Sequence, residues 1–193
     1  MNHLPRCARC LSDPLYIAYH DNERWVPVHD DRVHFEFLVL EAAQAWLSRL
    51  TVLKKREGYR KAFADFDPVK VAEFDATVVE ILLQNPAIIR NRAKIQAAIS
   101  NAHVFLEIQK ERGSFDHYLR HFTDGSVINN HMQSREDYIA TSSLSDAVSK
   151  DLKQRGMKFV GSTIMYAHLQ AVGVINDHLV ECFRHKEVKG MSN

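Results

Sequence analysis

The 193-residue chain has little of what would place a protein in a membrane or outside the cell. No apolar run approaches the roughly 20 residues that a membrane-spanning helix needs. The chain begins Met-Asn-His-Leu-Pro-Arg, and no apolar stretch follows this single arginine, so we expect no secretory signal. Without export, the three cysteines should stay reduced, which favours metal binding over disulfides. We therefore expect a cytoplasmic protein without membrane contacts.

Excess charge, strand signals and repeats are also lacking. The formal net charge is +1, so a surface that binds a polyanion has to be a local patch. We find no convincing strand pair, hairpin dipeptide, internal repeat or low-complexity tract. Helix signals dominate instead, and the hydrophobic fraction of 46% is ample for a core. The sequence predicts an all-α fold with a single domain over residues 1–193, either one globular unit or two small lobes that share a cleft.

Capping residues and helix breakers divide the chain into a series of predicted helices. One begins at Asp30-Asp31, and the others cover residues 47–63, 69–74, 76–84, 88–112, 114–122, 142–155, 162–172 and 176–183. Residues 123–140 are polar and contain glycine and asparagine, which predicts a loop.

Two pairs of cysteine and histidine lie near opposite ends of the chain. Cys7 and Cys10 form a C-x-x-C motif that His20 follows, and His178 and Cys182 are four positions apart, which a helix would place on one face. Two thiolates and two imidazoles complete a tetrahedral zinc shell with no open position, as in structural sites. Cys10 can compete with Cys7 or have no role. The alternative is that these are buried thiols and incidental histidines, because the chain has 11 histidines.

A glycine-containing turn between two predicted helices is a candidate phosphate-binding element. The pattern is typical of a helix–hairpin–helix element at about residues 146–172. Glycine lets the backbone approach a ligand closely, and the start of the second helix offers unpaired N–H groups. The candidate DNA-binding residues are Gly156, Lys158, Val160, Gly161, Ser162 and Thr163, with Lys153 and Arg155 adding positive charge. Such elements bind the duplex backbone without sequence preference; the alternative is an ordinary helix turn.

Several short segments, taken together, carry a resemblance to a known family. They are Arg6-Cys7, residues 13–21 (Asp-Pro-Leu-Tyr-Ile-Ala-Tyr-His-Asp), Leu40-Glu41, residues 88–92 (Ile-Ile-Arg-Asn-Arg), Lys94-Ile95, residues 156–163 and Asn176-Asp177-His178. In order and spacing, over about residues 6–183, they resemble DNA-3-methyladenine glycosylase I. The resemblance implies an all-α, two-lobed helix–hairpin–helix DNA glycosylase fold. It also implies a structural Zn²⁺ that joins the N- and C-termini through Cys7, His20, His178 and Cys182.

The resemblance also implies an activity. The family excises 3-methyladenine from alkylated double-stranded DNA by hydrolysing the N-glycosidic bond, which leaves an abasic site. Glu41 falls on the family's base-recognising carboxylate, which accepts hydrogen bonds from the base and attracts a cationic ring. Tyr16 and Tyr19 match pocket tyrosines that stack and hydrogen-bond. The alternatives are a helix-surface acid and core aromatics. We expect a monomer without strand-cleaving lyase chemistry or a protein partner.

Some residues depart from the family pattern. Arg49 stands where the family has a tryptophan that stacks on the base, and the exchange costs on the order of 1–2 kcal/mol of cation–π attraction. Arg49 can also pair with Glu41 and occupy the pocket itself. Trp46 replaces a usual glycine in the loop that enters the gap left by the extruded nucleotide, with Leu47 beside it as a plug. An indole can wedge between base pairs; the alternatives are packing in the core and blocking the pocket. These exchanges motivate a second hypothesis, a paralogue that binds lesions without excision.

Overall fold

The computed structural model describes residues 4–10 and 13–191, and this part of the chain is mostly helical, as predicted. The α-helices are α1 (Pro14–Asn22), α2 (Asp31–Gln44), α3 (Arg49–Ala62), α4 (Pro68–Ala72), α5 (Ala76–Gln84), α6 (Arg92–Arg112), α7 (Phe115–His121), α8 (Ser143–Gln154), α9 (Ser162–Ala171) and α10 (Phe183–Gly190). Short 3-10 helices cover Ala8–Cys10, Ala64–Phe66 and Arg135–Asp137. Within the described residues, no helix is both long and apolar enough to cross a membrane.

Local capping explains where most of these helices begin. The Asp30 side chain accepts hydrogen bonds from the first turn of α2, Ser48 does so for α3, and Asn91 does so for α6. The predicted starts at residues 47 and 88 were therefore too early, because the caps lie at Ser48 and Asn91.

Residues 14–22 form α1, a helix that was not predicted from the sequence. Asp13 caps this helix by accepting a hydrogen bond from the backbone N–H of Leu15, and Pro14 occupies its first turn. An aspartate followed by proline is a recognised helix start, so the signal was present in the sequence. The omission matters because α1 carries Tyr16, Tyr19 and His20.

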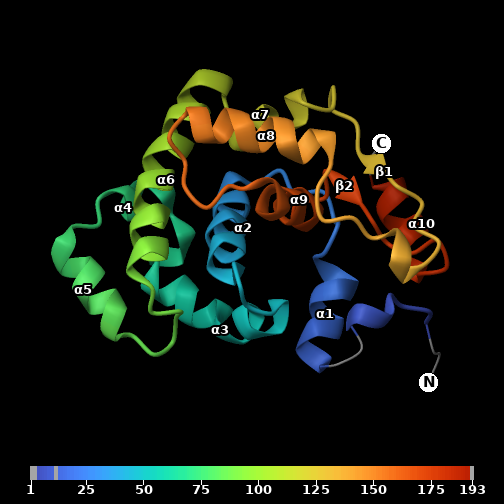
Figure 1. Cartoon of the computed structure of the whole chain (residues 1–193), viewed down its shortest axis with the longest axis horizontal. Helices are drawn as coiled ribbons and strands as arrows, with labels where there is room; N and C mark the ends of the chain where they lie inside the picture. Colours follow the sequence, from blue (N-terminus) through green and yellow to red (C-terminus); the bar gives the residue numbers. More distant parts are fainter. Residues whose placement is uncertain (1–3, 11–12, 192–193) are drawn as a thin grey trace.

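Helix α2 lies at the centre of the molecule (Figure 1) and packs against α3, α6, α7 and α9. Every residue from His34 to Ala43 is buried, since neighbours cover the helix on all sides. Phe35 contacts Phe105 of α6, whose ring stacks on Phe115 of α7 with centroids 4.4 Å apart. A helix buried all round has to pair its acidic side chains, and α2 contains two of them in this stretch, Glu36 and Glu41.

The predicted helix at residues 176–183 is wrong, and so is the prediction of a chain without strand pairing. Strands β1 (Ile128–Asn129) and β2 (Ile175–Asn176) pair in parallel, with Ile128 opposite Ile175. The Asn176 side chain donates to the side-chain oxygen of Asn129 at 2.9 Å and to the carbonyl of His185 at 3.2 Å. These tertiary hydrogen bonds hold the segment in an irregular path, so the last helix begins only after Cys182.

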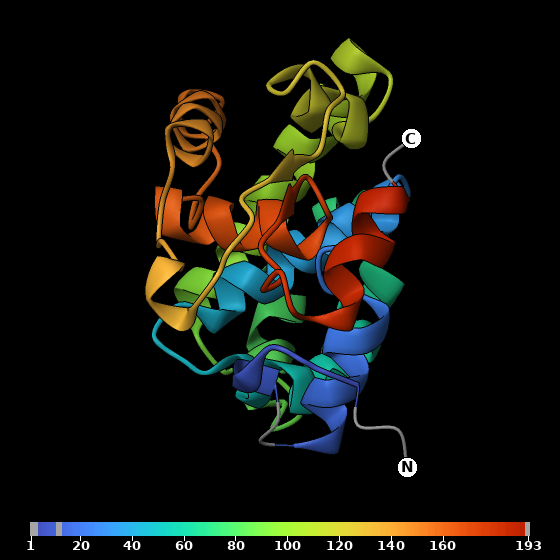
Figure 2. The ribbon, with the colours of Figure 1, turned by 90° about the vertical axis from the view of Figure 1, so that its right-hand side faces the viewer.

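The two ends of the described chain meet on one side of the molecule. Figure 2 shows α10 beside α1. The backbone N–H of Phe183 donates to the carbonyl of Pro5 at 2.9 Å, and a small apolar cluster that includes Trp25, Leu179 and Val188 packs between the ends.

Candidate active site and metal centre

Glu41 lies near the C-terminal end of α2 and is the best candidate for a functional acid. Its carboxylate is 1% exposed. Both of its oxygens accept hydrogen bonds from Arg49, the first residue of α3: Nη1 donates to Oε1, and Nη2 donates to Oε2 at 2.8 Å. The pairing anticipated as one option for Arg49 is therefore present. Glu41 does not lie on the helix surface.

The two tyrosines of α1 lie on the other side of this ion pair. The Arg49 guanidinium carbon is 5.8 Å from the centroid of the Tyr19 ring, and the rings of Tyr16 and Tyr19 are 6.3 Å apart. Burial raises the pKa of Tyr19, whose hydroxyl has no hydrogen-bond partner among the described residues. The structure thus brings together Glu41, Tyr16, Tyr19 and Arg49, which three separate helix segments contribute.

A cavity of about 480 Å³ opens next to these side chains. Its lining residues come from the N-terminal arm, α1 and the turn after it, the end of α2, the α2–α3 loop, the start of α3 and α9; they are Arg9, Tyr16, Arg24, Gln44, Leu47, Ser48, Arg49, Leu50, Ala167 and Gln170. A space of this size matches a small-molecule site. Three of the described lining residues are arginines and none is acidic, an unusual charge balance for a pocket that contains a buried glutamate at its edge.

Arg24 and Gln170 form a second polar wall that the sequence analysis did not place in the site. Arg24 is buried, and its guanidinium donates to the Tyr16 hydroxyl at 3.5 Å and to the Gln170 side-chain oxygen at 3.3 Å. Gln170 in turn donates to a carboxylate oxygen of Asp177 at 2.6 Å. Asp177 also accepts from the Tyr166 hydroxyl at 2.7 Å, so its charge is fully buried and hydrogen-bonded. Because Arg24 and Gln170 lie 146 positions apart, no local pattern in the sequence points to their contact.

Trp46 and Leu47 occupy the short loop between α2 and α3, at the mouth of the cavity. Trp46 is fully exposed and has a backbone φ of 70°, in the left-handed region. Core packing, one of the alternatives for Trp46, is therefore wrong. Leu47 is partly exposed and lines the cavity. An indole that gains no packing in the free protein is available to an external ligand.

The turn between α8 and α9 has the conformation that its glycines predict. Gly156 has φ +96° and ends α8, with the N–H of Met157 donating to the carbonyl of Leu152. Lys158 and Asn101 of α6 exchange two hydrogen bonds of 2.8 Å between side chain and backbone, which ties the turn to the core. A Cβ atom added at Gly161 would meet nothing within 4 Å, so its backbone is open to close approach.

The side chains of this turn differ in their availability to a phosphate. Lys158 and Thr163 are exposed, whereas Val160 is buried in the core. The Ser162 hydroxyl is hydrogen-bonded to that of Ser145 at 2.8 Å. Arg155 is ion-paired with Glu111 and Asp151, so it adds less positive charge here than its sequence position indicated.

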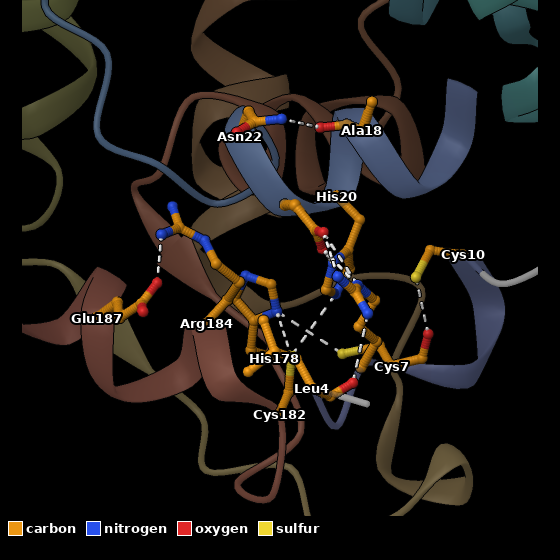
Figure 3. Close-up of polar contacts among 12 residues, drawn as sticks. Leu4, Cys7, Cys10, Ala18, His20, Asn22, His178, Cys182, Arg184 and Glu187 are labelled. Atoms are coloured by element: carbon orange, nitrogen blue, oxygen red, sulfur yellow. Dashed lines mark hydrogen bonds and ion pairs between the residues drawn. The ribbon is translucent and has the colours of Figure 1, made fainter. Parts of the chain in front are cut away.

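The two cysteine–histidine pairs converge into one buried cluster (Figure 3). His178 Nδ1 lies 3.6 Å from Cys7 Sγ and 3.4 Å from Cys182 Sγ, and His20 Nε2 lies 3.6 Å from Cys182 Sγ. Zinc bonds of about 2.3 Å to sulfur and 2.0–2.1 Å to nitrogen place adjacent ligand atoms of a tetrahedron about 3.6 Å apart. The four side chains therefore fit a zinc ion. His178 and Cys182 reach it from an irregular turn rather than from one helix face.

Neighbouring side chains support the cluster. His20 Nδ1 is hydrogen-bonded to Asp21 at 2.8 Å, and Asp21 also pairs with Arg6. A carboxylate behind a histidine fixes the ring so that its other nitrogen faces the metal position. The hydrogen bond between the two thiols lowers the pKa of Cys7 and raises that of Cys182. Cys10 is outside the cluster: its thiol donates to the carbonyl of Cys7 at 3.1 Å.

Comparison with known proteins agrees with this geometry. A family model described as methyladenine glycosylase matches residues 9–185. DNA-3-methyladenine glycosylase 1 of Escherichia coli (strain K12) is 47% identical over 179 residues, which cover 93% of this chain and 96% of that protein. A crystal structure of 3-methyladenine DNA glycosylase I matches with a TM-score of 0.90 and 49% identity, over 93% of this chain and 98% of that one.

A third relative has been studied for its recognition of 3-methyladenine. The 3-methyladenine DNA glycosylase I of Staphylococcus aureus, studied for the structural basis of 3-methyladenine recognition, is 36% identical, with a TM-score of 0.89 over 92% of this chain and 95% of that one. The fold is thus one that DNA glycosylases use. The chain belongs to the methyladenine glycosylase family, which confirms the resemblance seen in the sequence.

Proposed function

We propose that this protein is a DNA repair enzyme that hydrolyses the N-glycosidic bond of 3-methyladenine in alkylated double-stranded DNA and leaves an abasic site. The observation that carries the proposal is the buried Glu41 carboxylate next to two tyrosines at the edge of a 480 Å³ cavity. The relatives are all named as glycosylases, which supports excision over lesion binding alone.

The chemistry asks little acid catalysis of the protein. Methylation makes the base cationic, so its glycosidic bond is already weak, and the enzyme has to extrude the nucleotide and bind the base selectively. In our proposal the Glu41 carboxylate accepts hydrogen bonds from the everted base, while Tyr16 and Tyr19 stack or hydrogen-bond with it. Arg49 has to move for a base to reach Glu41 directly, because it occupies both carboxylate oxygens.

DNA binding is assigned to two loops. Trp46 wedges into the gap that the extruded nucleotide leaves, with Leu47 beside it. The α8–α9 turn acts as a helix–hairpin–helix element, in which the backbone around Gly161 and the start of α9 approach a phosphate and Lys158 supplies charge. Exposure of Trp46 and Lys158 and the open space at Gly161 support these roles.

We assign a structural Zn²⁺ to Cys7, His20, His178 and Cys182. The ligand spacing and the Asp21 support fit this metal, and a shell of four protein ligands leaves no position for a substrate. The ion would join the N-terminal arm to the segment before α10. A two-lobed arrangement, a monomeric state and a cytoplasmic location stay predictions from the sequence.

The test of the function is release of 3-methyladenine from a methylated duplex by the purified protein. We expect release that the Glu41→Ala variant loses by a factor of about 100 or more, since a hydrogen-bonded charge at the base is worth several kcal/mol. Glu80→Ala, an exposed acid on α5, is the matched control and should retain full activity. Release by the native protein no faster than by Glu41→Ala would refute the proposal.

A further inference from the structure

In the folded protein, the negative charge of the Glu41 carboxylate, which is proposed to recognise the base, is compensated by the positive charge of Arg49. Each terminal nitrogen of Arg49 donates a hydrogen bond to one oxygen of Glu41, and both side chains are almost completely buried, with exposed fractions of 10% for Arg49 and 1% for Glu41. Two donors in a fixed fork match two acceptor oxygens, which is the strongest geometry for a guanidinium and a carboxylate. A cationic ligand that enters the cavity therefore meets an ion pair with no net charge rather than a free negative charge.

The rest of the cavity wall adds positive charge. Arg24 lines the cavity and is buried, and no carboxylate contacts it among the described residues. Asp177, the acid behind Gln170, is already hydrogen-bonded to Gln170, Tyr166 and Asn130. Arg9 also lines the cavity, and its guanidinium lies over the Tyr138 ring; among the described residues it forms no ion pair with an acid. With Glu41 counted against Arg49, the site has an excess of two positive charges.

This charge balance changes which ligands the site favours. An opposite charge within about 4–6 Å stabilises an ionised group by the equivalent of 1–3 pKa units, and a like charge destabilises it to a similar degree. A cationic purine would compete with Arg49 for the same two oxygens and face Arg24 across the cavity. An uncharged purine suffers no such repulsion, and its ring nitrogens and carbonyl oxygens can accept hydrogen bonds from guanidinium groups.

We propose that Arg49, with Arg24, removes the site's preference for positively charged bases, so that it binds uncharged modified purines at least as tightly as cationic ones. Uncharged purine lesions are then ligands of the site, whereas the weak glycosidic bond of 3-methyladenine comes from the charge of that base itself. The inference rests on the proposed function, because it takes this cavity as the base pocket.

Two ligands of the same shape but different charge show how much of the binding affinity depends on charge rather than on shape. The first is 3,9-dimethyladeninium, which is permanently cationic, and the second is 3-deaza-3,9-dimethyladenine, its uncharged isostere. Isothermal titration at one salt concentration, and at a pH well above the pKa of the deazapurine so that it stays uncharged, gives the ratio of their dissociation constants. For the native protein we expect the uncharged ligand to bind equally or more tightly. For Arg49→Gln, which removes the charge beside Glu41, we expect the ratio to shift toward the cation by at least about tenfold.

Three further variants make the result specific. Arg92→Gln is the matched control, because Arg92 forms the same two-pronged pair with Glu80 at an exposed site; it should keep the native ratio. Arg49→Lys retains the charge and should also keep the native ratio. Arg49→Met, which is also uncharged and should shift the ratio, serves if Arg49→Gln does not fold. The double variant Glu41→Gln/Arg49→Gln should lose the gain in cation binding, because the gain needs a free carboxylate.

Three outcomes overturn the inference. They are a native preference for the cation of tenfold or more, a ratio that Arg49→Gln leaves unchanged, and binding of neither ligand by the native protein and Arg49→Gln. Base release from methylated DNA is measured separately. If release occurs and the ligand ratio contradicts us, only the charge selectivity fails; if release is absent while the ratio behaves as expected, the proposed reaction fails.

Discussion

At the scale of single residues, Glu36 and Glu41 of α2 are both buried acids, but their surroundings indicate different roles. Glu36 is paired with Arg56 and Arg60 of α3, and Glu41 with Arg49 of the same helix. Both acids are buried and both need a cationic partner. Only the Glu41 pair adjoins the cavity. We therefore assign the Glu36 pairs to packing of α2 on α3, and the Glu41 pair to the ligand site.

Trp46 provides a test in which stability and DNA binding should change in opposite directions. A non-glycine residue at φ 70° costs about 1–2 kcal/mol, and the exposed indole gains no packing in return. We expect Trp46→Gly to raise the free energy of unfolding by about 1 kcal/mol. Loss of a stacking ring should weaken binding to a duplex with an abasic site about tenfold.

Chemical denaturation and fluorescence anisotropy measure the two effects. Trp46→Ala is the control, because it removes the indole but retains a Cβ atom at the same φ. It should bind DNA as weakly as Trp46→Gly without the gain in stability. If both variants bind the duplex as tightly as the native protein, Trp46 is no wedge.

At the scale of elements, the α8–α9 pair shows one turn with two glycines in different roles. Gly156 is needed for conformation, since φ +96° is unfavourable for other residues. Gly161 has an ordinary backbone conformation and caps α9 without a side chain. Its missing Cβ is thus not required by the fold, and in our proposal it allows a phosphate to approach the backbone closely.

We expect Gly161→Val to fold with a loss of stability of about 1 kcal/mol or less, because open space surrounds the new side chain. Its affinity for duplex DNA should fall about tenfold, since the side chain keeps a phosphate from the N–H groups of α9. Gly190→Val is the control, as Gly190 is equally open but lies at the end of α10. Electrophoretic or anisotropy titration on an unmodified duplex measures the affinity. Equal losses in both variants would contradict a role of the turn.

At the scale of the whole molecule, the cysteine–histidine cluster joins parts of the chain that are remote in sequence. Cys7 and His178 are 171 positions apart, and α1, the N-terminal arm and the segment before α10 all contribute ligands. A cross-link over so long a loop stabilises a fold by about 5 kcal/mol in the chain-entropy model. In our proposal the metal takes no part in the reaction, so its loss should lower stability before it affects chemistry.

Removal of the metal tests this. We expect elemental analysis to find about one zinc per chain, and a strong chelator to lower Tm by on the order of 10 °C. Cys182→Ser should show the same loss and bind little zinc. Cys10→Ser should retain both zinc and Tm, because the Cys10 thiol bonds to a backbone carbonyl rather than to the cluster. The assignment would be contradicted if the purified native protein contained no zinc, or if the chelator left its Tm unchanged.

The sequence by itself determined the features that depend on neighbours within a few residues. The helix start at Asp30 follows from a cap that bonds two or three positions ahead, as predicted. The caps at Ser48 and Asn91 are equally local, although the starts predicted for these two helices were too early. Gly156 ends α8 because its positive φ is one that glycine readily adopts. Ligand chemistry also pointed to the two cysteine–histidine pairs before any geometry was known, and the family resemblance favoured Cys7 over Cys10 as the fourth ligand.

Only the tertiary structure decided how distant side chains share charge and hydrogen bonds. Residues 176–182 do not form the predicted helix, because the Asn176 side chain donates hydrogen bonds to Asn129 and His185, which both lie outside this segment. It placed Arg24 against Gln170 and closed Arg49 onto Glu41. A buried charge takes whichever partner the packed fold brings within about 3 Å, and that distance is set by helices that meet in space rather than by spacing along the chain.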